Sequence, residues 1–383
     1  MLPRARVIAR SFAQHHPTTP FFVLLADEVD GYFDPEQEAY ELVLLRDLDL
    51  PDRARFRFNH PQQRLSYAAT PYLLAMLLDR GYDRVVFIKQ ESLVLGDLRD
   101  TVSTLPPGGI ALTPHILAPL AADDVIEREL TILLAGTFNG GFVAVAEGET
   151  SRSFLKWWQE RVHSHCLYEV VAGMHYEQRW LDLVPGYFET TVLHDPGLNV
   201  GHWNLPERRI TVTNGTVYAD GHRCRLFRFS GYDPDRPKSA TSYFYTPRLE
   251  VSRLGDAAIV FERYRKALVA AGWAETRTWP YAYQCFDNGV AIPDLVRDIY
   301  AGLPDAERFG DPFATQGPTS FFRWLKEPAR NRKGPSHLWY GVYQRRADLQ
   351  SAFPDVFGRH RAGFRRWTHD SAAAEYGIPE ELV

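Results

Sequence analysis

Short apolar segments that alternate with amphipathic ones place the strongest constraint on how this chain folds. Residues 21–26 form a continuous apolar run and residues 84–88 a run rich in β-branched side chains; both are typical of strands buried on both faces. Residues 70–81 have helical spacing, from a Thr-Pro start to a glycine end. This order predicts an α/β fold with a doubly wound, mostly parallel sheet. Further strands are expected at 42–45, 109–113 and 142–146, and further helices at 4–15, about 123–134 and roughly 150–162.

The sequence changes character after about residue 245. An amphipathic helix is expected at 259–271, and segments rich in proline and aromatic residues, then a helical tail, follow it. A chain of 383 residues is long enough for two domains. We therefore predict one α/β domain over 1–245 and a mainly helical domain over 246–383.

Composition excludes several classes of protein. A formal charge of −5, from 43 Lys and Arg against 48 Asp and Glu, is too acidic for a general nucleic-acid binder. The apolar runs are far shorter than the ~20 residues of a membrane span, so no transmembrane segment is expected. The first residues lack the apolar core of a secretion signal, and three widely spaced cysteines build neither a disulfide framework nor a zinc site. These observations predict a bacterial cytoplasmic protein.

Polar and glycine residues stand next to the ends of the predicted strands, where a doubly wound sheet binds its ligands. Glycine at such a place lets the backbone approach a ligand closely. Further polar motifs follow along the chain, and the order and spacing of the motifs are more specific than any one of them. The candidate site residues are Lys89, Glu91, His115, Asn139, Gly140, Glu177, Gln178, Asp182, Asn199, Arg228 and Gly231.

In this order and spacing the motifs resemble those of bacterial GT-A glycosyltransferases related to the retaining galactosyl- and glucosyltransferases of the glycogenin type. The resemblance covers residues 1 to about 245, and the remainder looks like the helical extension of some bacterial members. It implies transfer of a sugar from a nucleotide-diphosphate sugar to an acceptor, such as a polysaccharide intermediate or a secondary metabolite. It also implies that the transferred sugar retains its anomeric configuration.

The sequence departs from this family where the family binds a divalent cation. Relatives use two aspartates after the strand at 84–88, and a histidine before the Ser-Gly-Tyr/Phe-Asp-Pro segment. Here Lys89 and Glu91 stand at the aspartate positions and Arg228 at the histidine position. Ammonium and guanidinium groups offer no lone pair to a metal, so no metal cofactor is expected. Lys89 and Arg228 together carry the charge of a divalent cation, which predicts metal-independent transfer with these two side chains on the diphosphate.

The resemblance also implies roles for the other candidates. Glu177 and Gln178 stand at the Asp-Gln pair that lies beneath the anomeric carbon, and Asp182 follows on the same predicted helix, so all three are candidate catalytic residues. The FN-x-GF segment of relatives holds the sugar, which places Asn139 and Gly140 on the donor. The full set of expected donor-binding residues is Lys89, Glu91, His115, Asn139, Gly140, Asn199, Arg228 and Gly231.

A second interpretation is a non-catalytic, degenerate glycosyltransferase that acts as a binding or scaffolding protein. In it, Lys89 and Arg228 form ion pairs with Glu91 and Asp233 in an inactive site. Relatives have a first strand that binds the nucleotide base, whereas here Met1 leads directly into a helix. Either the coding sequence starts upstream, or the nucleotide pocket is built differently or lost. Hydrolysis of a nucleotide sugar without an acceptor is a third possibility.

Overall fold

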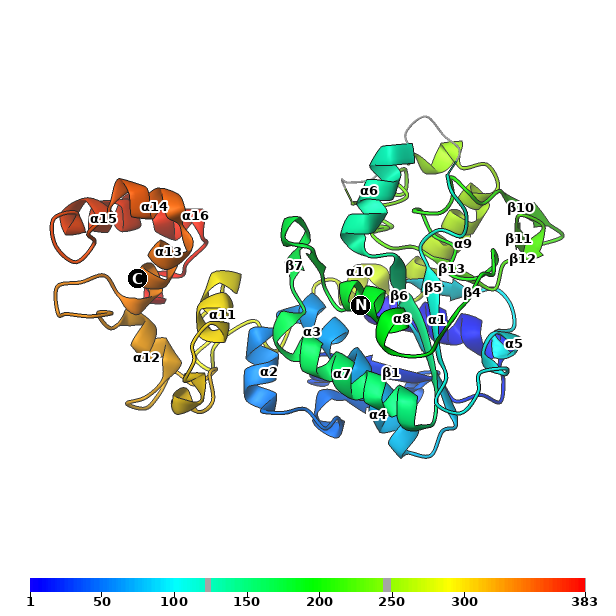
Figure 1. The fold of residues 1–383 in the computed structure, drawn as a ribbon, viewed down its shortest axis with the longest axis horizontal. Coiled ribbons are helices and arrows are strands. Elements are labelled where there is room, and N and C mark those ends of the chain that lie inside the picture. Colours follow the sequence, from blue (N-terminus) through cyan, green and yellow to red (C-terminus); the bar gives the residue numbers. More distant parts are fainter. Residues whose placement is uncertain (121–124, 244–248, 383) are drawn as a thin grey trace. The chain divides into compact units, whose positions relative to one another are not determined.

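The computed structural model describes residues 1–120, 125–243 and 249–382 (Figure 1). The chain forms two compact units: unit 1 is Met1–Asp49 with Ser66–Trp279, and unit 2 is Leu50–Leu65 with Pro280–Val383. The predicted boundary between 245 and 246 falls outside the described residues. The units divide instead between Trp279 and Pro280, and a short earlier segment belongs to the second unit.

The main sheet of unit 1 has four strands in the order β3-β6-β5-β9. These strands are β3 (Arg84–Ile88), β6 (Phe138–Ala146), β5 (Ile110–Pro114) and β9 (Thr190–Val192). The α/β class is confirmed, but β6 runs antiparallel to both of its neighbours, and only the β5–β9 pair of this sheet is parallel. The sheet is therefore more mixed than the sequence predicted. β5 and β6 pair antiparallel because the first residue of β6, Phe138, lies opposite the last residue of β5, Pro114. β6 then runs back along β5.

The remaining strands of unit 1 form smaller sheets. β1 (Phe22–Leu25) and β2 (Glu41–Leu44) make a parallel pair, and β4 (Ser92–Val94) pairs antiparallel with β13 (Leu226–Arg228). The others are β10 (Ile210–Thr213), β11 (Thr216–Ala219) and β12 (His222–Arg223) in one sheet, and β7 (Tyr168–Glu169) with β8 (Met174–His175) in another.

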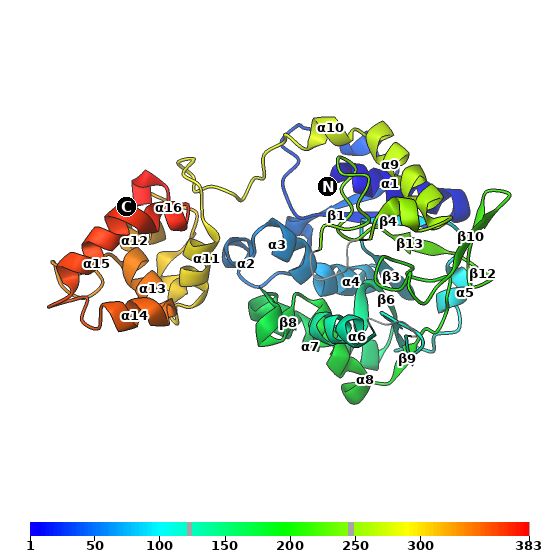
Figure 2. The same ribbon diagram turned by 90° about the horizontal axis from the view of Figure 1, so that it is seen from above.

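Helices cover the strands of unit 1. The long helix α1 (Leu2–His15) buries Ile8 and Phe12 against Phe142 of β6. The helix α9 (Ala257–Ala270) buries its apolar face in a second core, with Phe229, which is why unit 1 continues past residue 245. Figure 2 shows α1 and α9 on one side of the strands and α7 on the other. The other helices of the unit are α4 (Thr70–Asp79), α5 (Arg99–Val102), α6 (Val125–Ala135), α7 (Glu149–His165), α8 (Val184–Tyr187) and α10 (Trp273–Thr276). The division between the two units falls within α3 (Gln62–Ala68).

Unit 2 is built mainly from helices around an aromatic core. Phe58 is fully buried there and packs on Tyr300 and Phe321. The buried Arg297 donates a hydrogen bond of 2.7 Å to the carbonyl oxygen of Phe58. The helices are α2 (Arg53–Asn59), α11 (Asp294–Ala301), α12 (Phe321–Lys326), α13 (His337–Arg345), α14 (Ala347–Ala352), α15 (Arg361–Trp367) and α16 (Ala373–Glu375).

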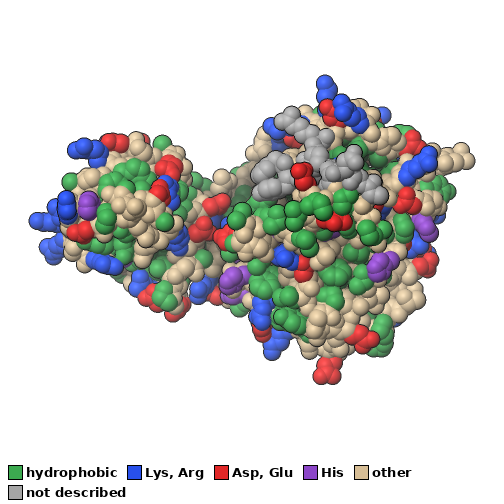
Figure 3. Space-filling view, turned by 45° about the horizontal axis from the view of Figure 1, so that its top comes forward, with side chains coloured by type: hydrophobic (Ala, Val, Ile, Leu, Met, Phe, Trp, Pro, Cys, Tyr) green, Lys and Arg blue, Asp and Glu red, His purple; other side chains and the backbone are tan. Residues whose placement is uncertain are grey.

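The surface matches the nearly balanced composition. On the face shown in Figure 3, positive and negative side chains are interspersed over each unit. Within the described part of the chain, no helix is long and apolar enough to cross a membrane.

Candidate functional site

A cavity of about 140 Å³ lies in unit 1, where β3 and β5 end and β6 begins. Its lining includes Lys89, His115, Asn139, Gln178 and Arg228, so the structure brings five of the predicted site residues to one place. Aromatic side chains complete the wall: Tyr67, Tyr168, Tyr176, Trp203 and Tyr243.

Two buried ion pairs dominate the electrostatics of this site. The Nζ atom of Lys89 lies 2.7 Å from Oε1 of Glu177, and a guanidinium nitrogen of Arg228 lies 2.6 Å from Oε1 of Glu91. All four side chains are at most 8% exposed. The predicted partners are corrected here, because Glu91 pairs with Arg228 rather than with Lys89, and Asp233 pairs with Arg236. The formal charges of the four side chains cancel.

Backbone geometry sets the Arg228–Glu91 pair. Arg228 lies at the end of β13, opposite Ser92 of β4, and this register puts its side chain beside Glu91. Gly141 makes room for the guanidinium, because a Cβ atom there would lie 1.6 Å from its NH1 atom. The charges of Arg228, Lys89 and Arg4 together outweigh the opposing effect of burial, so the pKa of Glu91 is lowered and its carboxyl is ionised.

Asn139 connects this ion pair to His115. Its Oδ1 atom accepts hydrogen bonds from the Gly141 amide, at 2.8 Å, and from the Arg228 guanidinium. Its Nδ2 atom must then face His115, whose Nε2 atom lies 2.9 Å away. Since an amide nitrogen donates, Nε2 accepts, and the proton of the imidazole is on Nδ1. Burial lowers the pKa of His115 to about 3, which keeps this ring neutral.

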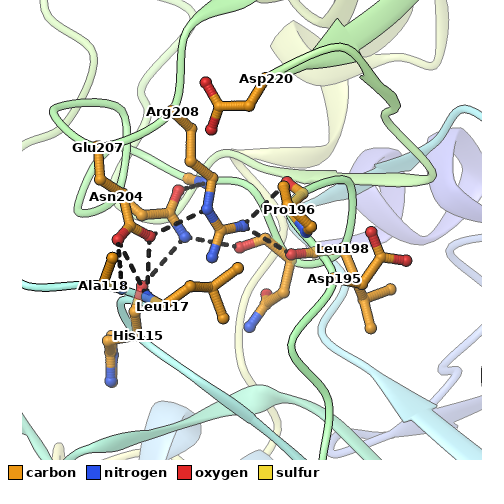
Figure 4. A network of polar contacts seen from close by, with 12 residues as sticks. His115, Leu117, Ala118, Asp195, Pro196, Leu198, Asn204, Glu207, Arg208 and Asp220 are labelled. Carbon is orange, nitrogen blue, oxygen red and sulfur yellow. Dashed lines mark hydrogen bonds and ion pairs between the residues drawn. The ribbon is translucent and has the colours of Figure 1, made fainter.

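A second polar network fixes the backbone that follows β5 (Figure 4). The Glu207 carboxylate accepts from the amides of Leu117, at 3.0 Å, and Ala118, at 3.2 Å. Asn204 donates to the carbonyl oxygen of His115 at 3.1 Å, and Arg208 donates to that of Leu198 at 2.9 Å. The loop that carries His115 is therefore fixed at two points: Asn139 contacts the His115 side chain, and Asn204 donates to the His115 carbonyl oxygen.

Gln178 uses both ends of its amide on the backbone. Its Oε1 atom accepts from the Gly140 amide at 2.9 Å, and its Nε2 atom donates to the carbonyl oxygen of Ala135 at 2.9 Å. The neighbouring Glu177 accepts, at its carbonyl oxygen, a hydrogen bond of 3.1 Å from the Trp158 indole. Gln178 thus fixes the start of β6 against the cavity.

Asp182 binds the backbone at the start of β6. Its Oδ1 atom accepts from the amides of Thr137, at 2.8 Å, and Phe138, at 3.3 Å, and its Oδ2 atom pairs with Arg179. It follows Glu177 on a 3₁₀-helix, η4 (Gln178–Leu183), and it is not among the described residues that line the cavity. Glu177 is not among these lining residues either, so the prediction that the two carboxylates reach one cleft stays a prediction. The Asp182 carboxylate fixes the backbone at the start of β6.

Asn199 and Gly231 shape the surrounding loops. Asn199 donates to the Thr113 hydroxyl of β5 at 2.8 Å and is buried. Gly231 has φ +73°, and a Cβ atom there would lie 2.4 Å from the Thr241 hydroxyl oxygen, so glycine is required on two counts. Neither residue is among the described residues that line the cavity.

The cavity wall also contains residues that the sequence prediction did not include, among them Tyr67, His175, His202 and Trp203. Two of these residues make cation–π contacts with the charged side chains of the site. Nζ of Lys89 lies 4.0 Å from the Tyr67 ring centre, and Cζ of Arg228 lies 5.3 Å from the Trp203 ring centre. Burial lowers the pKa of His175 to about 4 and that of His202 to about 3.

Several buried polar atoms of the site have no hydrogen-bond partner within the described ranges. Native proteins leave few such atoms, and those that exist are commonly satisfied by a ligand or by water. Those on the cavity wall are Nδ1 of His115, His175 and His202, Nε1 of Trp203 and Nε of Arg228, and the ion pairs add Oε2 of Glu91 and of Glu177.

A divalent cation does not fit the side chains at this place. Lys89 and Arg228 offer no lone pair, and both are engaged with carboxylates. Among the residues that the structure describes, no group of three or more His, Cys, Asp or Glu side chains could hold a metal ion.

No protein-family model matches the chain. Among curated proteins, it is similar to the uncharacterized protein YfnF of Bacillus subtilis, with 24% identity over 238 residues that span 60% of this chain and 78% of YfnF. It is also similar to the uncharacterized protein YfnD of the same organism, with 21% identity over 213 residues that span 51% of this chain and 66% of YfnD.

Solved structures give two further likenesses. One is the galactosyltransferase LgtC in complex with donor and acceptor sugar analogs, with 16% identity and a TM-score of 0.38 over 70% of this chain and 92% of LgtC. The other is the glycosyltransferase GlyE of Streptococcus pneumoniae, with 12% identity and a TM-score of 0.39 over 74% of this chain and 64% of GlyE.

Proposed function

We propose that this chain is a GT-A glycosyltransferase that moves a sugar from a nucleotide-diphosphate sugar to an acceptor without a divalent metal ion. The observation that carries the proposal is the cavity wall, which combines aromatic faces with buried polar atoms that have no partner among the described residues. A sugar supplies hydroxyl groups that donate and accept, and apolar faces that pack on aromatic rings. The order of motifs along the sequence supports the same function.

In this proposal Lys89 and Arg228 bind the diphosphate. Arg228 uses its two terminal nitrogens for Asn139 and Glu91, while its Nε atom has no partner within the described ranges. It can therefore donate to a phosphate oxygen without releasing Glu91. Lys89 has a single charged nitrogen at 2.7 Å from Glu177, and a phosphate would compete for it directly. Donor binding would then free the Glu177 carboxylate.

The freed Glu177 carboxylate is the proposed stabiliser of positive charge on the sugar. The bond between the anomeric carbon and the leaving phosphate breaks, the acceptor oxygen forms the new bond, and its proton passes to the phosphate. Retention of configuration rests on the resemblance stated above. Gln178 and Asn139 position the glycines of β6 beside the sugar.

A non-catalytic binding protein is the second candidate, and a specific observation favours it. The two cations are already neutralised by carboxylates within 2.7 Å, in a buried network whose formal charges cancel without a diphosphate. Such a network would resist opening, because breaking a buried pair costs several kcal/mol, about 3–5.

A donor panel tests both candidates. The chain is mixed with nucleotide-diphosphate sugars in EDTA or in manganese, and the melting temperature, sugar release and transfer to added acceptors are measured. We expect one donor to raise the melting temperature and to react equally in EDTA. Loss of reaction in EDTA with recovery in manganese would contradict metal independence. Binding without release or transfer would support the non-catalytic protein, and release without any acceptor would indicate hydrolysis.

A further inference from the structure

One segment of unit 2 concentrates positive charge. Residues 328–367 contain nine Lys and Arg against two Asp, in a chain whose formal charge is −5. Two of the nine are engaged, since Arg345 donates to backbone carbonyl oxygens and Arg346 pairs with carboxylates. The other seven are all exposed, and together they are named the basic surface: Arg330, Arg332, Lys333, Arg359, Arg361, Arg365 and Arg366.

The ring of Phe357 brings the two halves of the basic surface together. Cζ of Arg330 lies 4.8 Å from the Phe357 ring centre, and a Cβ atom on Gly334 would lie 2.9 Å from an atom of the same ring. The loop over residues 330–334 therefore packs against the segment that continues into Arg359 and α15. Figure 3 shows Lys and Arg side chains at the left end of unit 2, where Figure 1 places α15.

The helix α15 turns its cations outward because its apolar side is anchored. Phe364 is buried and packs on Tyr343, with ring centres 5.7 Å apart. Arg361 and Arg365 are four residues apart, so they share one face of the helix. These side chains add to the charge that the loop over residues 330–334 presents.

Carboxylates leave the basic surface uncompensated. Six of its members, all except Arg330, have neither an ion pair nor a side-chain hydrogen bond within the described part of the chain, and Arg330 donates to the Tyr340 hydroxyl at 2.6 Å. Asp355 is the one acidic residue in 349–367, and its carboxylate accepts from the amides of Gly358 and Arg359 instead. Clustered like charges destabilise a folded protein, so this surface is unfavourable unless an anion binds to it.

The residue types indicate the chemistry of that anion. Six of the seven cations are arginine, whose planar guanidinium binds a carboxylate or phosphate group through two parallel hydrogen bonds. Among the described residues of unit 2, no large apolar side chain is exposed. The surface therefore offers charge without the apolar groups that insert into a lipid bilayer. It suits an extended, water-soluble chain with anionic groups along its length.

We propose that the basic surface binds an anionic polysaccharide, with carboxylate or phosphate groups on its sugars, and that this polysaccharide is the acceptor. Only the role as acceptor rests on the proposed function. A polymer held along part of its length keeps its remaining sugars at a raised effective concentration near the enzyme. Charge recognition on unit 2 would thus select the acceptor.

Binding to the full chain is measured first, without any donor. The probes are polygalacturonate, which carries carboxylates, phosphomannan, which carries phosphates, and neutral dextran. We expect at least one anionic polysaccharide to bind and dextran not to bind. Raising the salt concentration from about 50 to about 300 mM should weaken the binding at least about tenfold, because salt screens exposed charges. The tighter of the two anionic probes identifies the group that is recognised.

Two triple variants locate the binding. Arg332→Gln/Arg361→Gln/Arg365→Gln removes three charges from the basic surface, and we expect binding at least about tenfold weaker with no loss in melting temperature, because repulsion falls. The control variant removes three exposed cations of unit 1, each of which has a carboxylate partner: Arg253→Gln/Lys266→Gln/Arg277→Gln. Its binding should stay within about threefold of the wild type, since exposed ion pairs contribute little.

Several results would overturn the proposal. Equal binding by the two variants would remove the basic surface from the interaction, and absence of binding to both anionic polysaccharides would remove the ligand class. Tighter binding of polyglutamate, single-stranded DNA or vesicles containing phosphatidylglycerol would assign the surface to another partner.

Transfer assays separate this proposal from the proposed function. Donor-dependent labelling of the bound polysaccharide, weakened in the variant of the basic surface, would support its role as acceptor. A donor that reacts with another acceptor but never with the bound polysaccharide would overturn that role and leave glycosyl transfer intact. Polysaccharide binding without binding of any donor would contradict the proposed function and leave the basic surface as a glycan-binding site.

Discussion

The Lys89 ammonium, which lines the cavity, and the Glu177 carboxylate, which is not among the lining residues, form a buried ion pair of 2.7 Å. The sequence assigns one to the diphosphate and the other to the anomeric carbon, yet in the structure each neutralises the other. Any ligand that engages Lys89 therefore changes the environment of Glu177. The coupling between binding and chemistry can be tested through these two side chains.

Removal of one partner of this pair should destabilise the protein strongly. Lys89→Met leaves Glu177 buried without its cation, and we expect a loss of about 3–5 kcal/mol in the free energy of unfolding. The double variant Lys89→Met/Glu177→Gln should recover a large part of this loss. Urea denaturation of the wild type, both single variants and the double variant measures the coupling. Additive losses would mean that the pair contributes nothing specific.

Glu177→Gln tests the role of the carboxylate in transfer, and because it also breaks the pair with Lys89 the assay is run well below the melting temperature of the variant. If the carboxylate stabilises charge on the sugar, transfer falls by about 100-fold or more while the donor still raises the melting temperature. Asp182→Asn is the matched control, because an amide oxygen can still accept from Thr137 and Phe138. Its transfer rate should stay within a few-fold of the wild-type rate. Equal losses in the two variants would contradict the assignment of Glu177.

Gly141→Ala should displace Arg228. The added Cβ atom would overlap the guanidinium, so we expect a loss of about 1–3 kcal/mol in stability together with weaker donor binding. Gly186→Ala in α8 is the control, because no heavy atom lies within 4 Å of its added Cβ atom. Thermal denaturation and donor titration of both variants check the prediction. A Gly141→Ala protein with unchanged donor affinity would remove Arg228 from the binding site.

Stability should fall on acidification below neutral pH. His115 and His202 have pKa values lowered to about 3 from an ordinary value of 6.5, so the unfolded chain binds protons that the folded chain does not. Each contributes stability that is present above pH 6.5 and is lost toward pH 3, at up to about 1.4 kcal/mol per pH unit. Urea unfolding at pH 7, 6 and 5 measures this slope. His115→Gln should make it shallower, and an unchanged slope would show that His115 titrates normally.

Parts of this arrangement follow from sequence alone because they depend on local pattern. The apolar run of β3 and the Thr-Pro start of α4 identify these elements, and the positions of Lys89 and His115 after strand ends bring them to one cavity. The direction of β6 does not follow, because this strand is buried on both faces and has a continuous apolar run although it pairs antiparallel.

Other features depend on contacts between distant segments. The amphipathic pattern of α9 shows that one face is buried, but not that it packs in the first unit. The ion pairs also depend on distant contacts: Lys89 pairs with Glu177 rather than with the nearby Glu91, and Glu91 pairs with Arg228. Asp182 has a sequence position suited to catalysis, and only the fold reveals that backbone amides of β6 already use its carboxylate.

The interrupted makeup of unit 2 has a consequence for the synthesis of the protein. Phe58 belongs to its core, yet Arg297, which donates to the Phe58 carbonyl oxygen, lies 239 residues later in the chain. On a ribosome the α2 segment emerges long before the helices that bury it. Its aromatic side chains stay without their native contacts while most of unit 1 is made, so unit 2 cannot be completed until the helices after residue 280 have been synthesised.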